Sequence, residues 1–383
     1  MSSQSTTRRN RASVLAAARS AGDASRAELA AATGLSVATV SRAVAALIES
    51  GLLVEQTAVG PAGGRPLGRV RVDDAAATVL AVDVADHHTT LALVDLGGAV
   101  RWSERLDDAP AGADERLDHT LRAIEGAWRL PHARRPPVAV GVAIPGPVQA
   151  DGTIDFAPAL HWHGIRLGDL LRQLLDAPVA VGNDANLIAV AESRWGEHRD
   201  ATSLMALAVF EGVGAGIVEH GRILEGSRGF AGQIGRMLVG PASIDRLYVD
   251  FGDLESQLGS RGLERRAASE GVELPAGVEP FAATFARAGE RSPAGDLARR
   301  VLDEFAVALA NVCALLDPEV IVLAGRFAPI ADTVVPELER RLTGRVLHIP
   351  RLVAASADGD GALLGAAAIA IDAFGSLERL LDA

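Results

Sequence analysis

The stretch that most constrains the fold is an apolar run, residues 177–181, followed at once by Gly182-Asn183-Asp184-Ala185-Asn186 and an amphipathic segment. Such a run, ending in small polar residues before a helix, is typical of a parallel strand that delivers side chains to a crevice at its carboxyl end. There Asp184 can bind a hydroxyl group or take its proton, and Asn183 offers a donor and an acceptor to a polyol. The alternative is that the two residues only form a turn and cap the next helix. Other motifs in the chain favour the first interpretation.

The length and composition indicate a globular protein with several domains. At 383 residues the chain exceeds what one core usually supports, so two or three domains are expected. The start of the chain is polar and basic, and no apolar run is long enough to cross a bilayer. The single cysteine, Cys313, has apolar neighbours that predict a buried helix. We therefore expect a cytoplasmic protein that makes no membrane contact.

Charge is distributed unevenly along the chain. Residues 1–73 contain nine arginines against five acidic residues, whereas the remainder has 28 against 44, and no lysine occurs anywhere. A basic head on an acidic body indicates nucleic-acid contact through the head. The absence of lysine excludes any mechanism that needs one, including a Walker lysine.

The head, residues 1–74, reads as a winged helix-turn-helix. Helices are predicted over 10–21, from the capping box Ser25 to Glu28 through residue 33, and over 37–50, where Ser36 caps the third helix after a Gly34 turn. Two strand-like runs around a turn rich in glycine and proline predict a wing. The alternative is a small helical bundle in which the hydroxyl side chains only cap helices. Agreement among the helices, turn, wing and positive charge favours DNA binding.

The predicted contacts with DNA come from the third helix and the wing. Small and hydroxyl side chains let that helix sit deep in the major groove, and an arginine on a slim Gly-Arg-Pro backbone suits a narrow minor groove. We expect Thr39 and Arg42 to read bases and Arg65 to enter the minor groove. The full set of expected DNA-binding residues is Ser36, Ala38, Thr39, Ser41, Arg42 and Arg65.

From residue 75 onward, apolar strand-like runs alternate with helices, which predicts two α/β lobes. The first lobe is expected over 75–190 and the second over 191–383, with a C-terminal helix that returns to the first lobe. Glycine-rich turns at several strand ends, among them 212–216, imply a cleft between the lobes. Taken singly these glycines are only turns, and 212–216 alone is a weak nucleotide signal.

Together these motifs resemble the ROK family (repressors, open reading frames and sugar kinases), in its branch with an N-terminal winged helix. The resemblance implies an actin-like, two-lobed, sugar-binding body behind the DNA-binding head. Residues 182–186 match the family's Gly-Asn-Asp-Ala-Asn motif, in which Asn binds sugar and Asp is the catalytic base of the kinases. Similar matches cover the Gly-Pro turn at 141–147, the glycine loop at 212–216, the turn at 231–235 and the segment 253–255. The implied sugar-binding residues are Gly146, Asn183, Asp184, Gln233, Arg236 and Glu255.

The chain departs from the kinase pattern at the phosphate and zinc motifs. Asp83 of the first phosphate motif is kept, but Ala85, Asp86, His87 and His88 fill the rest, and Asp86 adds negative charge where ATP phosphates should lie. Residues 236–253 contain neither His nor Cys, so the family's zinc site cannot form from this motif. We therefore expect no metal, no cofactor and no kinase activity, with Asp184 retained as a vestigial base that recognises sugar.

Three further positions carry more specific hypotheses. Gln233 replaces the Glu of the 231–235 turn, Arg236 replaces a zinc-ligating His, and Arg326 follows Gly325 where the family's adenosine loop usually has glycine. Arg236 either pairs with a sugar phosphate or sugar acid, or it pairs with Asp245, Asp250 or Asp253 in place of the lost zinc.

The segment around Trp162 carries another hypothesis. His161 and His163 flank Trp162 at a spacing that suggests a metal, but without a clustered third ligand a wall or lid is favoured, with Trp162 stacking on the sugar.

The resulting expectation is a transcriptional regulator, a repressor, with operator DNA and a sugar, sugar phosphate or sugar acid as partners. A homodimer presents two recognition helices about 34 Å apart, and a homotetramer is the other expected assembly. The alternative is an ATP-dependent sugar kinase fused to a DNA-binding domain, supported by Asp184 and the glycines of 212–216. A third possibility is a vestigial pocket in a regulator controlled by a protein partner, for which the retained polarity of Asn183, Asp184 and Glu255 is awkward.

Overall fold

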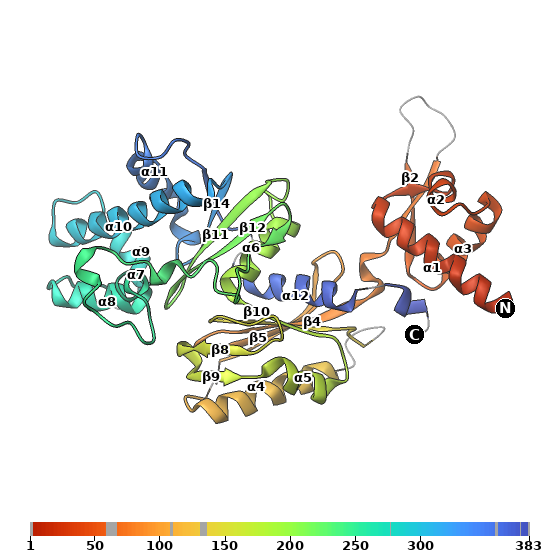
Figure 1. The fold of residues 1–383 in the computed structure, drawn as a ribbon, viewed down its shortest axis with the longest axis horizontal. Helices are drawn as coiled ribbons and strands as arrows, with labels where there is room; N and C mark the ends of the chain where they lie inside the picture. The colour runs from red at the N-terminus through yellow and green to blue at the C-terminus, as the bar shows by residue number, and fades with distance from the viewer. Residues whose placement is uncertain are drawn as a thin grey trace.

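A computed structural model describes residues 3–58, 67–107, 110–130, 136–275, 277–356, 359–375 and 377–381. A small head and a larger two-lobed body lie along the longest axis of the molecule (Figure 1). Within these described ranges, the head contains a three-stranded sheet and each lobe of the body contains a five-stranded sheet. We refer to the parts as the head, the first lobe and the second lobe.

The head forms because short-range capping signals start its helices. The Ser25 hydroxyl accepts a hydrogen bond from the Glu28 amide, and the Glu28 carboxylate accepts one from the Ser25 amide. Ser36 accepts from the Thr39 amide, so both predicted caps are confirmed. The first helix begins at Ser3, seven residues earlier than predicted. Its polar N-terminal turns carry no apolar stripe, so periodicity does not reveal them. The elements are α1 (Ser3–Ala21), β1 (Ala24–Ser25), α2 (Arg26–Thr33), α3 (Val37–Glu49), β2 (Leu53–Ala58) and β3 (Leu67–Val72).

The first lobe places the carboxyl ends of three parallel strands side by side. Its sheet has the order β10-β7-β4-β5-β6, and the β10, β7 and β4 strands run parallel. On one face lie α4 and α5, and on the other lies the last long helix of the chain (Figure 1). The elements are η1 (Asp74–Ala76), β4 (Thr78–Val84), β5 (Thr89–Asp95), β6 (Val100–Leu106), α4 (Ala113–Trp128), β7 (Val140–Ile144), β8 (Ile154–Ala157), η2 (Pro158–Leu160), β9 (Trp162–Ile165), α5 (Leu167–Leu175), β10 (Val179–Asn183) and α6 (Asp184–Trp195).

The second lobe repeats this arrangement with the strand order β13-β12-β11-β14-β15. Its long buried helix α10 contains Cys313, which is buried as predicted. The elements are β11 (Ser203–Val209), β12 (Val213–Glu219), β13 (Arg222–Ile223), η3 (Ile234–Arg236), η4 (Pro241–Ser243), α7 (Asp253–Leu258), α8 (Ser260–Ser269), α9 (Pro280–Phe285), α10 (Pro293–Leu316), β14 (Val320–Gly325), η5 (Ala328–Ile330), α11 (Ala331–Leu342) and β15 (Arg351–Ala354).

The glycine-rich segment 212–216, which resembles a glycine loop of the family, lies mostly within strand β12. A Cβ on Gly216 would lie 2.2 Å from the Ala185 carbonyl oxygen, and one on Gly214 would lie 3.1 Å from the Ala185 side chain. The first turn of α6 therefore rests directly on the backbone of β12, which leaves no room for a side chain. Packing alone accounts for these two glycines.

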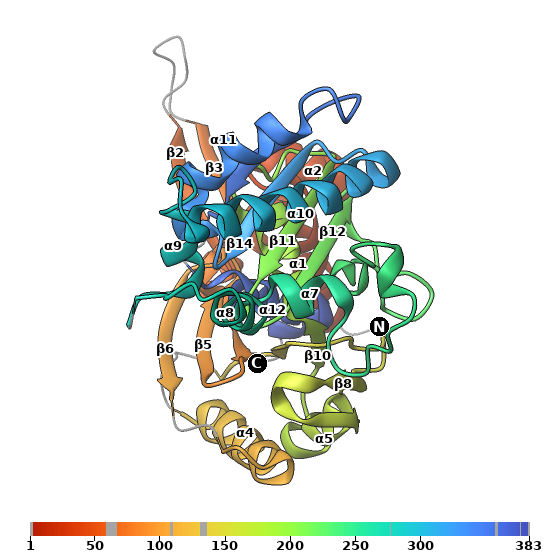
Figure 2. The same cartoon turned by 90° about the vertical axis from the view of Figure 1, so that its left-hand side faces the viewer.

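Helix α12 (Gly361–Phe374), followed by η6 (Leu377–Leu381), connects the body to the head. It lies on the first-lobe sheet and beside α6, and in the perpendicular view it is seen between the strands of the two lobes (Figure 2). A Cβ on Gly141 would lie 1.9 Å from the Ala366 carbonyl oxygen, so glycine in β7 allows this close approach. At the other end, Nη1 of Arg19 in α1 donates to the Gly375 carbonyl at 2.7 Å. The C-terminal segment thus contacts both the first-lobe sheet and the head.

In the described residues, no single helix has the length and apolar character needed to cross a membrane. The bent pair α2 and α3 meets that test together, by length and composition only.

Candidate DNA-binding surface and effector cleft

Helices α2 and α3 have the geometry of a helix-turn-helix. The chain direction turns by 112° between them, within the range of this motif. Gly34 makes the turn possible because its φ of 69° lies in the left-handed region. Residues other than glycine adopt this backbone conformation only with steric strain. The geometry that the sequence predicted for the head is therefore present.

The expected base-reading side chains lie at the front of α3. Ser36, Ala38 and Arg42 are exposed, while Thr39 and Ser41 are partly exposed. The hydroxyls of Ser36 and Thr39 lie 2.9 Å apart and share a hydrogen bond. Val37 is 55% exposed beside them, which adds an apolar group suited to a thymine methyl. Arg65 lies outside the described residues.

Gly146, Asn183 and Asp184 meet at the carboxyl ends of two adjacent strands. Asn183 is paired in register with Ile144 of β7, just before the turn that contains Gly146. Nδ2 of Asn183 donates to the Gly146 carbonyl at 3.1 Å and to Oδ1 of Asp184 at 2.9 Å. Its Oδ1 caps α6 by accepting from the Asn186 amide at 3.2 Å. The capping interpretation is therefore confirmed for Asn183, while the binding of a hydroxyl group by Asn183 and Asp184 stays a prediction.

Burial and like charges raise the pKa values of the carboxyl groups in this cleft. Burial raises the pKa of Asp83 to about 7, with further contributions from the carboxylates of Asp184 and Asp360. Burial also raises the pKa of Asp184 to about 6, against hydrogen bonds from the Ala185 amide and Asn183 that favour the ionised form. These carboxyl groups therefore keep only part of their negative charge near neutral pH, but all of them accept hydrogen bonds, a setting that favours hydroxyl groups over anions.

Glu255 connects the glycine turn 231–235 to the start of β12. Its Oε1 accepts from the Gly252 amide at 2.6 Å and its Oε2 from the Val213 amide at 3.4 Å. Burial raises the pKa of Glu255. A Cβ on Gly235 would lie 2.7 Å from Oε2 of Glu255, so this turn closes tightly on the carboxylate. Gln233 lies in the same turn and is half-buried.

Arg236 stabilises the segment that replaces the family's zinc loop. Its guanidinium donates to the carbonyls of Tyr248, Val249 and Asp250 at 3.3, 3.4 and 3.0 Å. The group also lies over the Phe156 ring at 5.1 Å, which joins it to the β8–β9 hairpin of the first lobe. The alternative in which Arg236 pairs with the carboxylate of Asp245, Asp250 or Asp253 is not among the contacts of the described residues, where its hydrogen-bond partners are backbone carbonyls.

The expectation that Trp162 stacks on a sugar is wrong. The side chain of Trp162 is 1% exposed, and its Nε1 donates to the Ala113 carbonyl at 3.0 Å. Alternation along β9 turns Trp162 inward against α4, whereas His163 faces outward and stacks on Phe156 at 6.4 Å. Phe156 thus contacts both His163 and Arg236.

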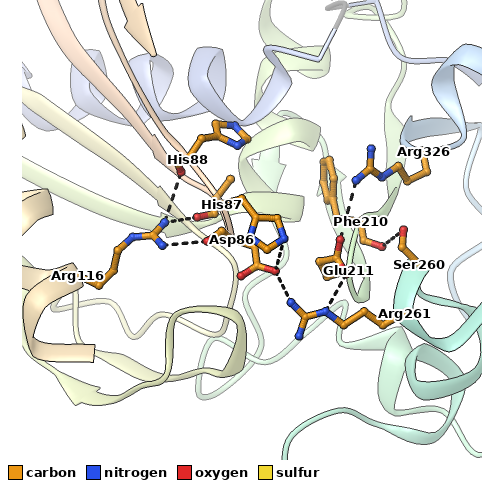
Figure 3. A network of polar contacts seen from close by, with 10 residues as sticks. Asp86, His87, His88, Arg116, Phe210, Glu211, Ser260, Arg261 and Arg326 are labelled. Carbon is orange, nitrogen blue, oxygen red and sulfur yellow. Dashed lines mark hydrogen bonds and ion pairs between the residues drawn. The ribbon is translucent and has the colours of Figure 1, made fainter. Parts of the chain in front are cut away.

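A chain of ion pairs crosses between the lobes on the side where the resemblance places nucleotide phosphates (Figure 3). Nη2 of Arg261 in α8 lies 2.6 Å from Oδ2 of Asp86, and its Nε lies 3.1 Å from Oε2 of Glu211. Arg326 lies 3.9 Å from Glu211 and 3.6 Å from Glu279. Side chains of this protein therefore fill the region with alternating charges.

A buried arginine, Arg116, stabilises the turn that carries Asp86. Arg116 of α4 is 3% exposed and donates to the carbonyls of Ala85, Asp86 and His88 (Figure 3). Because Arg116 donates to three carbonyls, it fixes the conformation of this loop, which lacks the glycines of the family's phosphate motif. Asp86 is thereby aimed at Arg261.

Within the described part of the chain, one group of three side chains has ligand atoms close enough together for a metal ion. These are Asp86, His87 and Glu211, whose ligand atoms lie within 4.8 Å of one another. Arg261 already pairs with both carboxylates, so a cationic group of the protein occupies this position.

Sequence reasoning missed Arg116, Glu211 and Arg261. Arg116 and Arg261 belong to helices whose local pattern only indicates charged, solvent-facing positions, and Arg261 is 175 residues from Asp86. The loss of the phosphate glycines at 85–88 was the available signal that other groups fill this space.

Two family models match the chain. A model described as "ROK family" matches residues 79–373, and one described as "Winged helix-turn-helix DNA-binding" matches residues 8–54.

The chain is also similar to curated proteins of two kinds. It is 26% identical to the "Putative xylose repressor" of Caldicellulosiruptor sp. (strain Rt8B.4), over 82% of each chain. It is 26% identical to the "DNA-binding transcriptional dual regulator NagC" of Escherichia coli (strain K12), over 85% of this chain and 82% of that one. It is 27% identical to an "N-acetyl-D-glucosamine kinase" of Escherichia coli O6:H1, over 74% of this chain and 96% of that one.

Among solved structures, a ROK family transcriptional regulator, described as a homolog of the Escherichia coli MLC protein, has the same fold with a TM-score of 0.78 at 23% identity. The match covers 99% of this chain and all of the other.

Proposed function

The chain belongs to the ROK family and carries a winged helix-turn-helix ahead of the family domain, and from this premise we propose that it is a sequence-specific transcriptional regulator controlled by a carbohydrate effector. Relatives named "Putative xylose repressor" and "N-acetylglucosamine repressor" support regulation of sugar-related genes and a repressor role. The operator contacts we propose are Ser36, Ala38, Thr39, Ser41, Arg42 and Arg65.

The polar groups at the carboxyl ends of the first-lobe strands support a neutral sugar as the effector. The carboxylate of Asp184 interacts electrostatically with Asp83, and that of Glu255 with Asp184. Burial disfavours the ionisation of all three groups. An anionic ligand would add a further negative charge to this setting. We propose that Gly146, Asn183, Asp184, Gln233 and Glu255 form the sugar site.

We propose that Arg236 holds the segment 248–250 in place rather than pairing with an anionic ligand. Its donors already serve three carbonyls, and releasing them leaves those carbonyls unsatisfied. A sugar phosphate or sugar acid as the effector would therefore have to break this set of contacts. Calorimetry with a neutral sugar and its phosphate, on the unchanged chain and on Arg236→Ala, tests this choice: a preference for the phosphate that disappears in the variant would restore the anionic ligand.

The observation that carries the regulatory function over the catalytic one is the ion-pair chain from Asp86 through Arg261 and Glu211 to Arg326. Phosphoryl transfer needs cations and backbone donors arranged around the transferred group. Here the two arginines are matched by Asp86, Glu211 and Glu279, so the region offers a nucleotide no net positive charge. We propose that the protein is not an enzyme and that the cleft needs no cofactor.

We propose that the units act as a DNA-binding domain at 1–74, a first lobe at 75–190 and a second lobe at 191–383, with α12 returning to the first lobe. A homodimer, or a homotetramer built from dimers, would present two α3 helices to a palindromic operator. A sugar that binds one arrangement of the lobes better than another shifts operator affinity by that difference.

Fluorescence anisotropy of the protein on the intergenic DNA beside its own gene, at fixed salt, tests the proposal. A panel of neutral sugars and sugar phosphates is added without ATP, and ATP alone serves as the control. We expect one sugar to change the affinity for DNA. DNA binding that no sugar alters would contradict the effector role and favour a vestigial pocket controlled by a protein partner.

A sugar kinase remains the second candidate function because Asp184 keeps the position of a base and one relative is a kinase. A coupled assay for ADP release in the presence of the same sugars tests it. Turnover that is lost in Asp184→Asn would establish catalysis, whereas equal background in both proteins would leave the regulatory function alone.

A further inference from the structure

A cavity of about 340 Å³ lies at the joint between the head and the body. Its volume is within the range of small-molecule sites. The head contributes the end of α1, the end of β3 and Asp74, and the body contributes Leu96 after β5, α6, α12 and η6. The lining residues are Ala18, Arg19, Gly22, Arg71, Val72, Asp74, Leu96, Arg194, Ile371 and Leu377.

Three arginines line this joint cavity, and each makes its described hydrogen bonds through Nη1. Arg19 donates to the Gly375 carbonyl at 2.7 Å. Arg71 donates to Oδ2 of Asp74 at 2.7 Å and to its neighbouring carbonyl at 3.1 Å. Arg194 donates to the Ala368 carbonyl at 3.1 Å and to Asp372 at 2.9 Å. These bonds fix the three guanidinium groups at the cavity wall.

Each of these three guanidinium groups has further N–H donors beyond those of Nη1. A guanidinium has five N–H donors, and for these three arginines the described contacts through Nη1 leave those of Nε and Nη2. The lining contains one carboxylate, that of Asp74, which pairs with Arg71, and Arg194 pairs with Asp372 beside the cavity, so three cations stand against two carboxylates. This balance is opposite to that of the body, which is strongly acidic. Planar groups with several N–H donors suit carboxylate and phosphate oxygens.

We propose that the joint cavity binds a small anionic metabolite through its carboxylate or phosphate group, and that the bound anion fixes the orientation of the head on the body. Arg19 and Arg71 belong to the head and Arg194 to the body, so one ligand contacts both parts. Operator affinity then changes by the difference in ligand affinity between the two orientations.

This site is separate from the sugar cleft. Helix α6 begins at Asp184 in the cleft and reaches Arg194 ten residues later, which places the two groups about 15 Å apart along the helix. The two sites share α6 and α12, so each ligand acts on the same elements from opposite ends.

Isothermal titration calorimetry of the full chain with citrate and with inorganic phosphate tests the site, with NaCl used to keep ionic strength constant. We expect one of the two anions to bind the unchanged chain. Its affinity should be at least tenfold lower for Arg194→Gln and for Arg71→Gln, and Arg194→Lys should recover part of the lost affinity. Arg172→Gln, which removes an arginine of the first lobe outside the cavity, should bind normally. Equal binding to Arg194→Gln and the unchanged chain, or no heat beyond that of NaCl, would overturn the site.

Two readouts separate this proposal from the function proposed above. Sugar binding in the cleft should persist in Arg194→Gln, which also shows that the variant is folded. On DNA, the anion that binds should alter affinity at least threefold at constant ionic strength, and this change should vanish in Arg194→Gln. If the anion binds but does not change DNA affinity, the site stands and its coupling to the head is contradicted. If no sugar binds while the anion still does, only the proposed sugar effector is contradicted.

Discussion

Nη2 of Arg261 in the second lobe lies 2.6 Å from Oδ2 of Asp86 in the first lobe, so this ion pair joins the two lobes directly. The same guanidinium reaches Glu211 through its Nε, so one residue holds a carboxylate from each lobe. Arg261 is 48% exposed and Asp86 15% exposed, so water weakens the attraction without removing it. The chain therefore supplies its own cation at the place where a kinase cleft would close on a bound nucleotide.

Removing this cation should favour the open arrangement of the lobes. In Arg261→Gln we expect a loss of about 0.5–1 kcal/mol in the closed state, which weakens sugar binding roughly two- to fivefold. The dependence of sugar affinity on salt should also fall, because the pair is screened by ions. Calorimetry at low and high salt measures both effects. Arg265→Gln, on the same helix and bonded to the Ser256 carbonyl, is the matched control, and an equal loss in the control would show a general effect of α8.

Arg42 should contribute directly to operator recognition. We expect Arg42→Ala to weaken binding to the operator by about 1–3 kcal/mol and to relax the preference at one base pair. Anisotropy with a set of single-base operator variants measures both quantities. Arg122→Ala, which removes an exposed arginine of α4 in the body, should leave DNA binding unchanged. Uniform weakening across all sequences would instead assign Arg42 to a phosphate.

Stability should depend on pH through Asp83. Its pKa is about 7 in the folded chain, because of burial and then the carboxylates of Asp184 and Asp360, and about 4 in an unfolded chain. Between these values the folded chain holds a proton that the unfolded chain releases, so stability falls as pH rises, and the full penalty is present above pH 7.

The substitution Asp83→Asn should remove that penalty. We expect the variant to have a higher Tm than the unchanged chain at pH 8 and a similar Tm at pH 4, measured by differential scanning calorimetry. Asp118→Asn, on the exposed face of α4, should not change the pH dependence. A variant that is less stable at pH 8 would show that an ionised Asp83 has a stabilising partner.

Effector binding should require the ionised form of Asp184. Because a carboxylate accepts hydroxyl hydrogen bonds more strongly than an amide, Asp184→Asn should bind the sugar about ten- to a hundredfold more weakly. In the unchanged chain, affinity should fall as the pH drops below the pKa of about 6. DNA binding without sugar should persist in Asp184→Asn. Asp200→Asn, on an exposed turn, is the control, and sugar affinity that is independent of both changes would move the sugar site elsewhere.

Gly216 should be required for packing between α6 and β12. A Cβ there would lie 2.2 Å from the Ala185 carbonyl, so Gly216→Ala should destabilise the chain by about 1–3 kcal/mol. Gly126→Ala in α4, where nothing lies within 4 Å of the new Cβ, should instead stabilise by about 0.5–1 kcal/mol. Thermal unfolding of the two variants compares them directly. A harmless Gly216→Ala would mean that α6 can shift away from the strand.

Local hydrogen bonds explain which features were predictable from the sequence. The capping box of Ser25 and Glu28 and the cap at Ser36 join residues three apart, so the pattern of side chains alone identifies them. Asn183 and Asp184 were predictable for a related reason, since they follow directly on a buried strand. The inward orientation of Trp162 was not, because it depends on where α4 packs.

The sequence by itself determined the family, the winged helix-turn-helix, the two α/β lobes and the polar end of β10, because these follow from local periodicity, caps and ordered motifs. The tertiary structure alone decided the partners of the arginines. Arg261 meets Asp86 across 175 residues and Arg19 meets Gly375 across 356, and no local pattern encodes either contact. A long charged side chain can reach many acceptors, so its partner is set by how the lobes and helices pack, which also places three such groups around the joint cavity.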